Sequence, residues 1–282
     1  LPGIIPGTNK EQGTTDEDKN STLFYMSIKN YNKGITKLQH HEDYMSKVTV
    51  TTAVTQRRST RDYLPKSVPL SMVQEILNLA LRSPSGGNTQ PWKIYVVAGD
   101  AKQDLTTSVE KAMVDGSLSH ATPEFAIYPD KNSTPPAPPA FLDRRRKLGY
   151  AMYNLMGVDR KDKIGRAKAM GRNYDFFGAP VGMIITVEKA CDANGWGHVG
   201  CLLQSICLLA EERNLGTCLQ EAWGNLGRTV YNSLNIPDNE VVWCGLALGY
   251  PDTTKPVNTL RSEREELSTV ASFAGFSEKS KL

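Results

Sequence analysis

A dense group of cationic and hydroxyl side chains lies early in the chain, in residues 57–61. The run consists of Arg57, Arg58, Ser59, Thr60 and Arg61, and no carboxylate follows until Asp62. Guanidinium groups bind phosphate through paired, charge-assisted hydrogen bonds, and hydroxyls add further donors. The run therefore indicates a site for a phosphorylated ligand. An exposed basic turn is the alternative interpretation, and the run alone does not decide between them.

A second segment combines glycines with amide side chains in residues 84–92. It consists of Pro84, Ser85, Gly86, Gly87, Asn88, Thr89, Gln90, Pro91 and Trp92. The glycines let a ligand approach the backbone closely, and each amide offers one acceptor and two donors in a plane. That pattern is typical of a site for a planar heterocycle whose edge alternates C=O and N–H. The alternative is a turn before a strand, with Trp92 entering the core.

Two other arrangements match known motifs by their letters. Residues 195–200 fit G-x-G-x-x-G, and Glu221 follows at about the interval of a dinucleotide-binding unit. A Rossmann turn needs its first glycine directly at the end of a strand, whereas residues 188–194 intervene here, so we expect a core helix instead. Cys191, His198 and Cys201 resemble zinc ligands, but buried thiols on a helix are the simpler interpretation, and no metal site is predicted.

The overall composition excludes several classes of protein. The chain has 282 residues, of which 39% are hydrophobic and 22% charged, with a net charge of +3. These values suit a folded domain and give no general attraction for nucleic acid. The longest apolar run, residues 179–187, is too short to span a membrane. The five cysteines form no C-x-x-C pair, so we expect a reducing, cytoplasmic location; the first residue is Leu, which leaves open a removed targeting segment.

Helix and strand patterns alternate around these clusters. Helical periodicity covers residues 71–81, where residues 71–74 have the form of a capping box, and residues 103–114, 199–215 and 225–234. Gly216 is expected to close the third of these helices in the left-handed conformation. Strand patterns cover residues 94–98, 181–187, 217–220 and 241–248. Helices dominate and no repeat occurs, so the sequence predicts one three-layer core with a sheet between helices.

The chain divides into a core with appendages. Residues 1–47 are polar and lack an apolar period, so we expect a flexible or partner-wrapping arm. Residues 48–276 form the single predicted domain, and residues 277–282 a short tail. Within the domain, residues 115–173 have a looser pattern and are interpreted as a lid-like insertion. Its four consecutive cations, residues 144–147, are interpreted as a solvated helix face, and the alternative is that they attract an anionic substrate.

Taken in order, the motifs resemble those of the FMN-dependent nitroreductase family, in its oxygen-insensitive form. The segments 57–61 and 84–92 look like its two opening signatures. The later matches are residues 177–181, residues 215–217 with Gln220, residues 249–251, and Arg264. The resemblance covers roughly residues 54–276, and several matches in order with suitable intervals are more specific than any one of them.

The resemblance implies an α+β subunit with a central mixed β-sheet flanked by helices, in a homodimer that exchanges terminal arms and binds FMN at its interface. It also implies a ping-pong reaction, in which NADH or NADPH reduces FMN and a nitroaromatic, quinone or related electron-poor acceptor takes the electrons. Such chemistry resides in the cofactor and needs no catalytic triad. Two alternatives stay open: a flavin-dependent dehalogenase or dehydrogenase on the same fold, and a flavin-binding or sensing protein with negligible turnover.

The resemblance also implies roles for individual residues. Arg57, Arg58 and Ser59 would contact the FMN phosphate, with Arg264 closing on it. Arg61 would lie at the N1/O2 edge of the flavin, where a cation favours reduction. Some relatives carry an acidic residue where Gln220 stands and a basic one where Ser262 stands, and Arg261 is expected to replace the latter. The full predicted cofactor-binding set is Arg57, Arg58, Ser59, Arg61, Pro84, Ser85, Gly86, Asn88, Gln90, Gln220, Glu221, Arg261 and Arg264, with Asn88 at the pyrimidine edge and Gln220 and Glu221 in the loop beside N5.

Overall fold

The centre of the fold is an antiparallel sheet. The structure, a computed structural model, describes residues 48–114 and 132–276. Within them, four strands lie in the order β1 (Trp92–Ala98), β2 (Val181–Glu188), β4 (Glu240–Gly249) and β3 (Gly216–Gln220). The three neighbouring pairs of these strands are all antiparallel.

The prediction of a mixed sheet therefore needs correction for the described strands. Their parallel component is a single isolated bridge between Ser59 and Thr217. The reason is that an apolar pattern predicts which residues form a strand but not the direction of its neighbours, since parallel and antiparallel pairs bury similar side chains.

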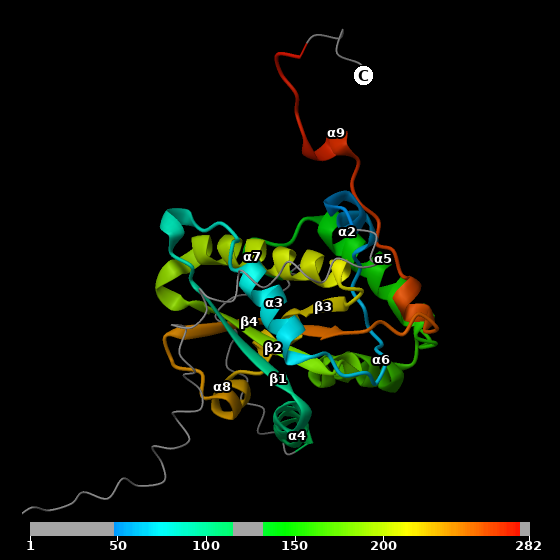
Figure 1. Cartoon of the computed structure of the whole chain (residues 1–282). Coiled ribbons are helices and arrows are strands. Elements are labelled where there is room, and N and C mark those ends of the chain that lie inside the picture. Colours follow the sequence, from blue (N-terminus) through cyan, green and yellow to red (C-terminus); the bar gives the residue numbers. More distant parts are fainter. Residues whose placement is uncertain (1–47, 115–131, 277–282) are drawn as a thin grey trace, which may run out of the picture. The chain divides into compact units, whose positions relative to one another are not determined.

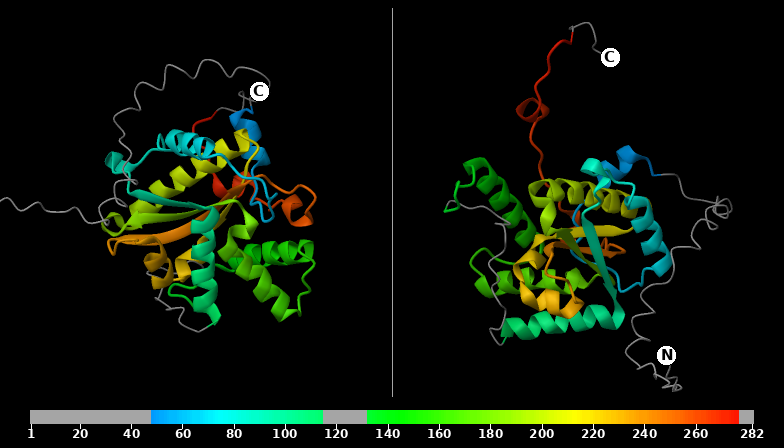
Figure 2. Two further views of the ribbon diagram at one scale, coloured as in Figure 1. Left: turned by 60° about the horizontal axis from the view of Figure 1, so that its bottom comes forward. Right: turned by 90° about the vertical axis from the view of Figure 1, so that its left-hand side faces the viewer.

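Helices cover both faces of this sheet (Figures 1 and 2). On one face, α3 (Leu70–Ala80) and α7 (Asp192–Glu212) pack against side chains such as Met183 and Ile185. On the other face, α4 (Gly99–Val114) and α8 (Arg228–Leu234) join a cluster that includes Ile184. Successive residues of a strand point to opposite faces, which explains why β2 is apolar and buried along almost its whole length. The three-layer α+β architecture is confirmed.

Two predicted helix ends are wrong. Helix α3 begins at Leu70 after Pro69, and Ser71 already lies inside its first turn, so the capping box at residues 71–74 does not form. After α7 the left-handed residue is Asn214, with φ of 56°, and Gly216 is the first residue of β3. Gly216 is needed for space instead, because a Cβ there would lie 2.3 Å from Oγ1 of Thr60.

The predicted insertion contains two further helices, α5 (Pro139–Leu155) and α6 (Lys163–Gly171). The cations at residues 144–147 lie exposed on α5, as expected of a solvated face. The remaining described elements are α2 (Val50–Gln56), η3 (Gly86–Asn88), η4 (Arg172–Gly178), η5 (Lys189–Cys191), η6 (Glu221–Asn225), η7 (Pro256–Thr259) and α9 (Leu267–Val270). The predicted arm (1–47), part of the insertion (115–131) and the tail (277–282) lie outside the described residues. No helix in the described ranges has the length and apolarity to cross a bilayer.

Glycine is required at position 245 of β4. A Cβ there would lie 2.2 Å from Cδ1 of the buried Trp223. We expect Gly245→Ala to lower the free energy of unfolding by about 1–3 kcal/mol, because the indole or the strand must shift. Gly149 in α5 has open space around it, so Gly149→Ala should raise that free energy by up to about 1 kcal/mol. Urea denaturation of both variants tests the pair, and a Gly245→Ala protein as stable as the wild type would contradict this packing.

Candidate functional site

The basic run at residues 57–61 lies along the outer edge of the sheet. It follows α2 directly and continues as extended chain beside β3, which is an edge strand. The Thr60 backbone N–H donates to the Thr217 carbonyl at 2.9 Å, and Thr60 itself is buried. The run is thus held by backbone bonds to the core, which excludes a loose basic turn.

One amide side chain fixes the end of the run. Asn258, buried after β4, accepts a hydrogen bond from the Arg61 backbone N–H through Oδ1 at 2.8 Å. Its Nδ2 donates to the carbonyls of Asp62 and Asp252, each at 2.8 Å. The Asp62 carboxylate also pairs with Arg172 at 3.0 Å. Asn258 belongs to no recognisable motif, so its role could not be predicted from the sequence.

Three predicted arginines gather at the end of α2. The Arg261 guanidinium donates to the carbonyls of Thr55 and Gln56 at 3.2 and 2.7 Å, where helix carbonyls lack intrahelical partners. Glu211, at the end of α7, accepts a hydrogen bond from the Arg58 backbone and interacts electrostatically with Arg58, Arg57 and Arg261. We call Arg57, Arg58 and Arg261 the arginine cluster. Such a group of guanidinium donors suits an anion with several acceptor oxygens, such as a phosphate.

Arg61 and Arg57 lie near buried thiols. Burial raises the pKa of Cys218, while the charge of Arg61 and a hydrogen bond with Ser59 lower it in part. Burial likewise raises the pKa of Cys207, and the charge of Arg57 opposes this in part. Both thiols therefore stay protonated at neutral pH and support the run by packing rather than as nucleophiles.

The amide-rich segment at residues 84–91 forms a loop at the other end of α7, exposed except for the partly buried Ser85 and the buried Pro91. The Gly86 N–H donates to His198 Nε2 at 3.1 Å, which anchors the loop to α7. Gln90 donates to Asn88 Oδ1 at 3.1 Å, and both residues have positive φ, of 47° and 56°. His198 thus anchors the loop instead of joining Cys191 and Cys201, and the described residues contain no group of three ligands suited to a metal.

Helix α7 separates the two predicted halves of the site. His198 contacts the loop and Glu211 contacts the arginine cluster, and the two residues lie 13 positions apart on one helix. At 1.5 Å per residue the separation is about 20 Å. Figure 1 shows the loop beyond one end of α7 and α2 at the other. A single chain therefore does not bring residues 84–91 and the arginine cluster together. The G-x-G-x-x-G run lies inside this helix, which excludes a Rossmann turn there.

Gln220 and Glu221 lie where β3 meets η6. Gln220 is buried, and its Nε2 donates to the Asn173 carbonyl at 2.7 Å. Its Oε1 is buried without a donor among the described residues. Unpaired buried acceptors are rare and mark positions that a ligand or ordered water completes. Glu221 is half-buried beside it.

Arg264 is not brought to the arginine cluster. Its exposed guanidinium donates to the carbonyls of Ser262 and Glu263 and to the Ser262 hydroxyl, at 3.1, 2.9 and 2.6 Å. The segment that carries it is exposed from residue 261 to residue 270. Arg264 instead lines a cavity between α5 and residues 260–265.

A sequence model of the nitroreductase family matches residues 54–250. The chain belongs to the nitroreductase family. It is 36% identical over 223 residues to a 4-nitrobenzoate reductase of Pseudomonas putida, covering 79% of this chain and 94% of that one. A chloronitrobenzene nitroreductase of Comamonas testosteroni is 36% identical over 220 residues, covering 78% and 94%. Among solved structures, the FMN- and NADPH-dependent nitroreductase NfnB of Sphingopyxis sp. strain HMH superimposes with a TM-score of 0.76 at 34% identity, covering 81% of this chain and all of that one.

Glu211 gives the cluster a measurable pH dependence. Burial raises the pKa of its carboxyl above the ordinary 4.5, and the attraction of Arg58, Arg57 and Arg261 opposes this only in part. The folded state then keeps the proton to a higher pH than the unfolded state, so this group makes the free energy of unfolding fall as pH rises above 4.5. Glu211→Gln should remove that contribution. Denaturation of both proteins from about pH 4 to about pH 7 measures it, and a contribution of opposite sign would refute the assignment.

Proposed function

We propose that the protein is an FMN-dependent oxidoreductase that uses NADH or NADPH in a ping-pong reaction to reduce nitroaromatics, quinones or related electron-poor acceptors. The arginine cluster, assembled in a chain of this family, is the observation that carries the proposal. The names of the relatives support it, because they include reductases of 4-nitrobenzoate and chloronitrobenzene and an FMN- and NADPH-dependent enzyme.

The residues present fit FMN. Arg57, Arg58 and Arg261, with Ser59, offer charge and donors to its phosphate. The exposed amides of Asn88 and Gln90, on the loop that also carries Pro84, Ser85 and Gly86, suit the edge of the flavin ring. Arg61 would place a cation near that ring, and Gln220, which has an unpaired buried acceptor, and Glu221 would border it. When bound, FMN supplies the hydride chemistry, so the protein's residues have to bind, orient and tune it.

We infer further that two copies complete each site. The loop and the arginine cluster lie at opposite ends of α7, so one FMN meets both if a second copy brings its loop to the cluster. The C-terminal segment extends away from the helical layers in Figures 1 and 2. Its apolar side chains are exposed, and an exposed apolar surface of this kind supports pairing of chains: Leu267, Val270, Phe273 and Phe276. Arg264, on that same segment, would then reach a phosphate through pairing. All five cysteines are free thiols, which supports a cytoplasmic location.

The proposal is tested first by the spectrum and turnover of the purified protein. We expect bound flavin absorbance, oxidation of NADH or NADPH on adding 4-nitrobenzoate, and the parallel-line kinetics of a ping-pong reaction. Binding of FMN without turnover would favour the flavin-sensing alternative. A protein that neither carries nor takes up FMN would refute the proposal.

Arg264→Ala tests the contact with phosphate from the C-terminal segment. Loss of a charge-assisted contact should weaken FMN binding by about 1.5–3 kcal/mol. Fluorescence titration of the flavin-free protein with FMN measures this. Arg160→Ala is a matched control, because Arg160 packs on Tyr150 at 4.6 Å from the ring centroid and belongs to no predicted contact with FMN. Equal affinities in the two variants would show that Arg264 does not touch the phosphate.

Mixed dimers test the shared site. Arg58→Ala and Asn88→Asp should each reduce FMN retention, and Asp tolerates the positive φ of position 88. In a dimer of one copy of each variant, one of the two sites has both its cluster and its loop unchanged. Purification through two different tags should therefore recover about half of the wild-type flavin content. No recovery in correctly paired dimers would contradict a site built from two chains.

A further inference from the structure

Two adjacent residues of η4 bond to the two segments that are assigned to the flavin ring. Arg172 pairs with the Asp62 carboxylate at 3.0 Å, and Asp62 directly follows Arg61. The carbonyl of Asn173 accepts a hydrogen bond from Gln220 Nε2 at 2.7 Å. The last two residues of the predicted insertion therefore contact the ring end of the candidate site, away from the arginine cluster assigned to the phosphate.

The η4 turn has a shape that the core holds in place. Phe176 and Phe177 have φ of 57° and 56°, in the left-handed region that bulky side chains rarely adopt. Packing stabilises this conformation, since Phe176 is fully buried and stacks on Trp223 with 4.6 Å between the ring centroids. The Nη2 of Arg172 also donates to the Phe177 carbonyl at 2.9 Å, while its Nη1 donates to Asp62. The guanidinium is thus bonded to the turn on one side and to the carboxylate on the other.

Asp62 carries a negative charge next to the cation that is assigned to the flavin edge. Its side chain is 23% exposed, so water screens this charge only in part. Arg61 donates to the Ser59 carbonyl at 3.4 Å, a long and weak hydrogen bond, so its guanidinium can change partners. Without Arg172, the Asp62 carboxylate would compete for Arg61 and would repel negative charge on a ligand nearby.

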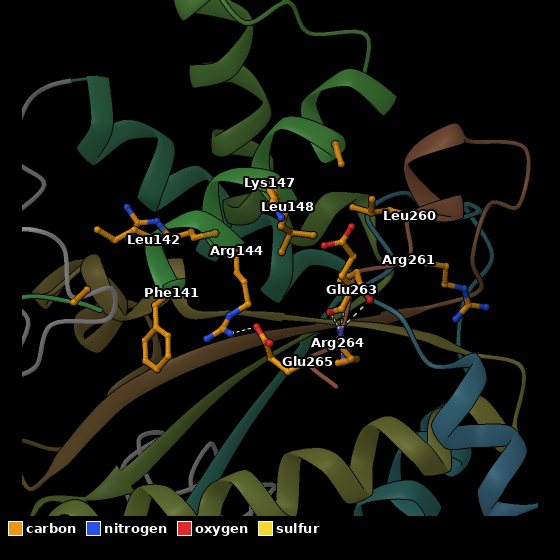
Figure 3. Close-up of a pocket in the computed structure, with 14 residues that line it drawn as sticks. Phe141, Leu142, Arg144, Lys147, Leu148, Leu260, Arg261, Glu263, Arg264 and Glu265 are labelled. Atoms are coloured by element: carbon orange, nitrogen blue, oxygen red, sulfur yellow. Dashed lines mark hydrogen bonds and ion pairs between the residues drawn. The ribbon is translucent and has the colours of Figure 1, made fainter. Parts of the chain in front are cut away.

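Other arginines near the candidate site have different partners. Arg261 donates to carbonyls at the end of α2, and Arg264 bonds within its own segment, as the dashed lines of Figure 3 show. Among the described residues, the ion pair of Asp62 is with Arg172. Arg172 is therefore the cation that balances this carboxylate.

We propose that Arg172 is a positioning residue for the cofactor: by holding the Asp62 carboxylate, it keeps the Arg61 guanidinium available to the flavin and raises the reduction potential of bound FMN. This inference rests on the proposed function and specifies how the protein tunes its cofactor. Reduction adds negative charge to the flavin ring, which a nearby cation stabilises and a nearby carboxylate destabilises. Arg172 acts through Asp62 and Arg61 and needs no contact of its own with FMN.

The test is the midpoint potential of FMN, measured by anaerobic spectroscopic titration of the flavin-loaded, full-length protein. We expect Arg172→Gln to make reduction about tenfold less favourable, which lowers the potential of a two-electron couple by about 30 mV. Arg172→Lys should keep the wild-type potential because it keeps a cation opposite Asp62. Arg228→Gln is the matched control, since Arg228 also pairs with one aspartate, Asp238, which lies outside residues 57–62 and η4. Its potential should equal that of the wild type.

A double variant separates the effect of charge from support of the turn. Arg172→Gln combined with Asp62→Asn lacks the ion pair but also lacks the free carboxylate, so its potential should return to near the wild-type value. A potential as low as that of Arg172→Gln alone would show a merely structural role and overturn the inference. So would an unchanged potential in Arg172→Gln, or an equal fall in Arg228→Gln.

Loss of the cofactor from a variant is also decisive. If Arg172→Gln retains no FMN, recovery of flavin at the wild-type potential in the double variant supports the inference, and no recovery overturns it. A wild-type protein that binds no FMN refutes the proposed function and this inference with it, whereas the outcomes above refute the inference alone.

Discussion

The backbone pairing of residues 59 and 60 with Thr217 is the interaction on which the candidate site depends. It places a basic run on the outer edge of β3, so that the side chains of Arg57, Arg58 and Arg61 leave from a backbone fixed by the core. Close approach is possible because Gly216 has no Cβ where the Thr60 side chain packs. Asn258 then anchors the far end of the run with three hydrogen bonds. Side chains on a fixed backbone lose less entropy on binding a ligand, which is what retention of a cofactor requires.

Helix α7 imposes the second constraint, because it acts as a rigid spacer. Its core face packs against the sheet, and its two ends hold the amide loop through His198 and the arginine cluster through Glu211. A straight helix cannot shorten, so the roughly 20 Å between these anchors is set by the number of residues between them. The fold thus separates groups whose chemistry suits one cofactor, and the exposed C-terminal segment points to pairing of chains as the way to reunite them.

Local chemistry could be predicted from the sequence, and long-range placement could not. The arginine run, the amide loop and the four strands follow from residue types and periodicity. The capping box at residues 71–74 is wrong because Pro69 starts the helix earlier, and the role of Gly216 is steric rather than terminal. Asn258 was missed since one amide, 197 positions from Arg61, leaves no local pattern. The 20 Å separation was missed for a similar reason: family motifs order the binding residues along a chain but do not say which copy supplies each one.

The small net charge conceals two concentrations of positive charge that differ in how they are held. In the arginine cluster, Arg261 bonds helix carbonyls, and the neighbouring Glu211 has a pKa that burial raises and the charges of Arg58, Arg57 and Arg261 lower in part. At the α5 cavity, Lys147 and the carboxylates facing it are exposed, and ordering them would cost side-chain entropy. A cluster whose side chains are already fixed favours slow release of its ligand, whereas a cluster of mobile side chains favours rapid exchange of the ligand. The fixed arrangement therefore suits a cofactor kept through many turnovers.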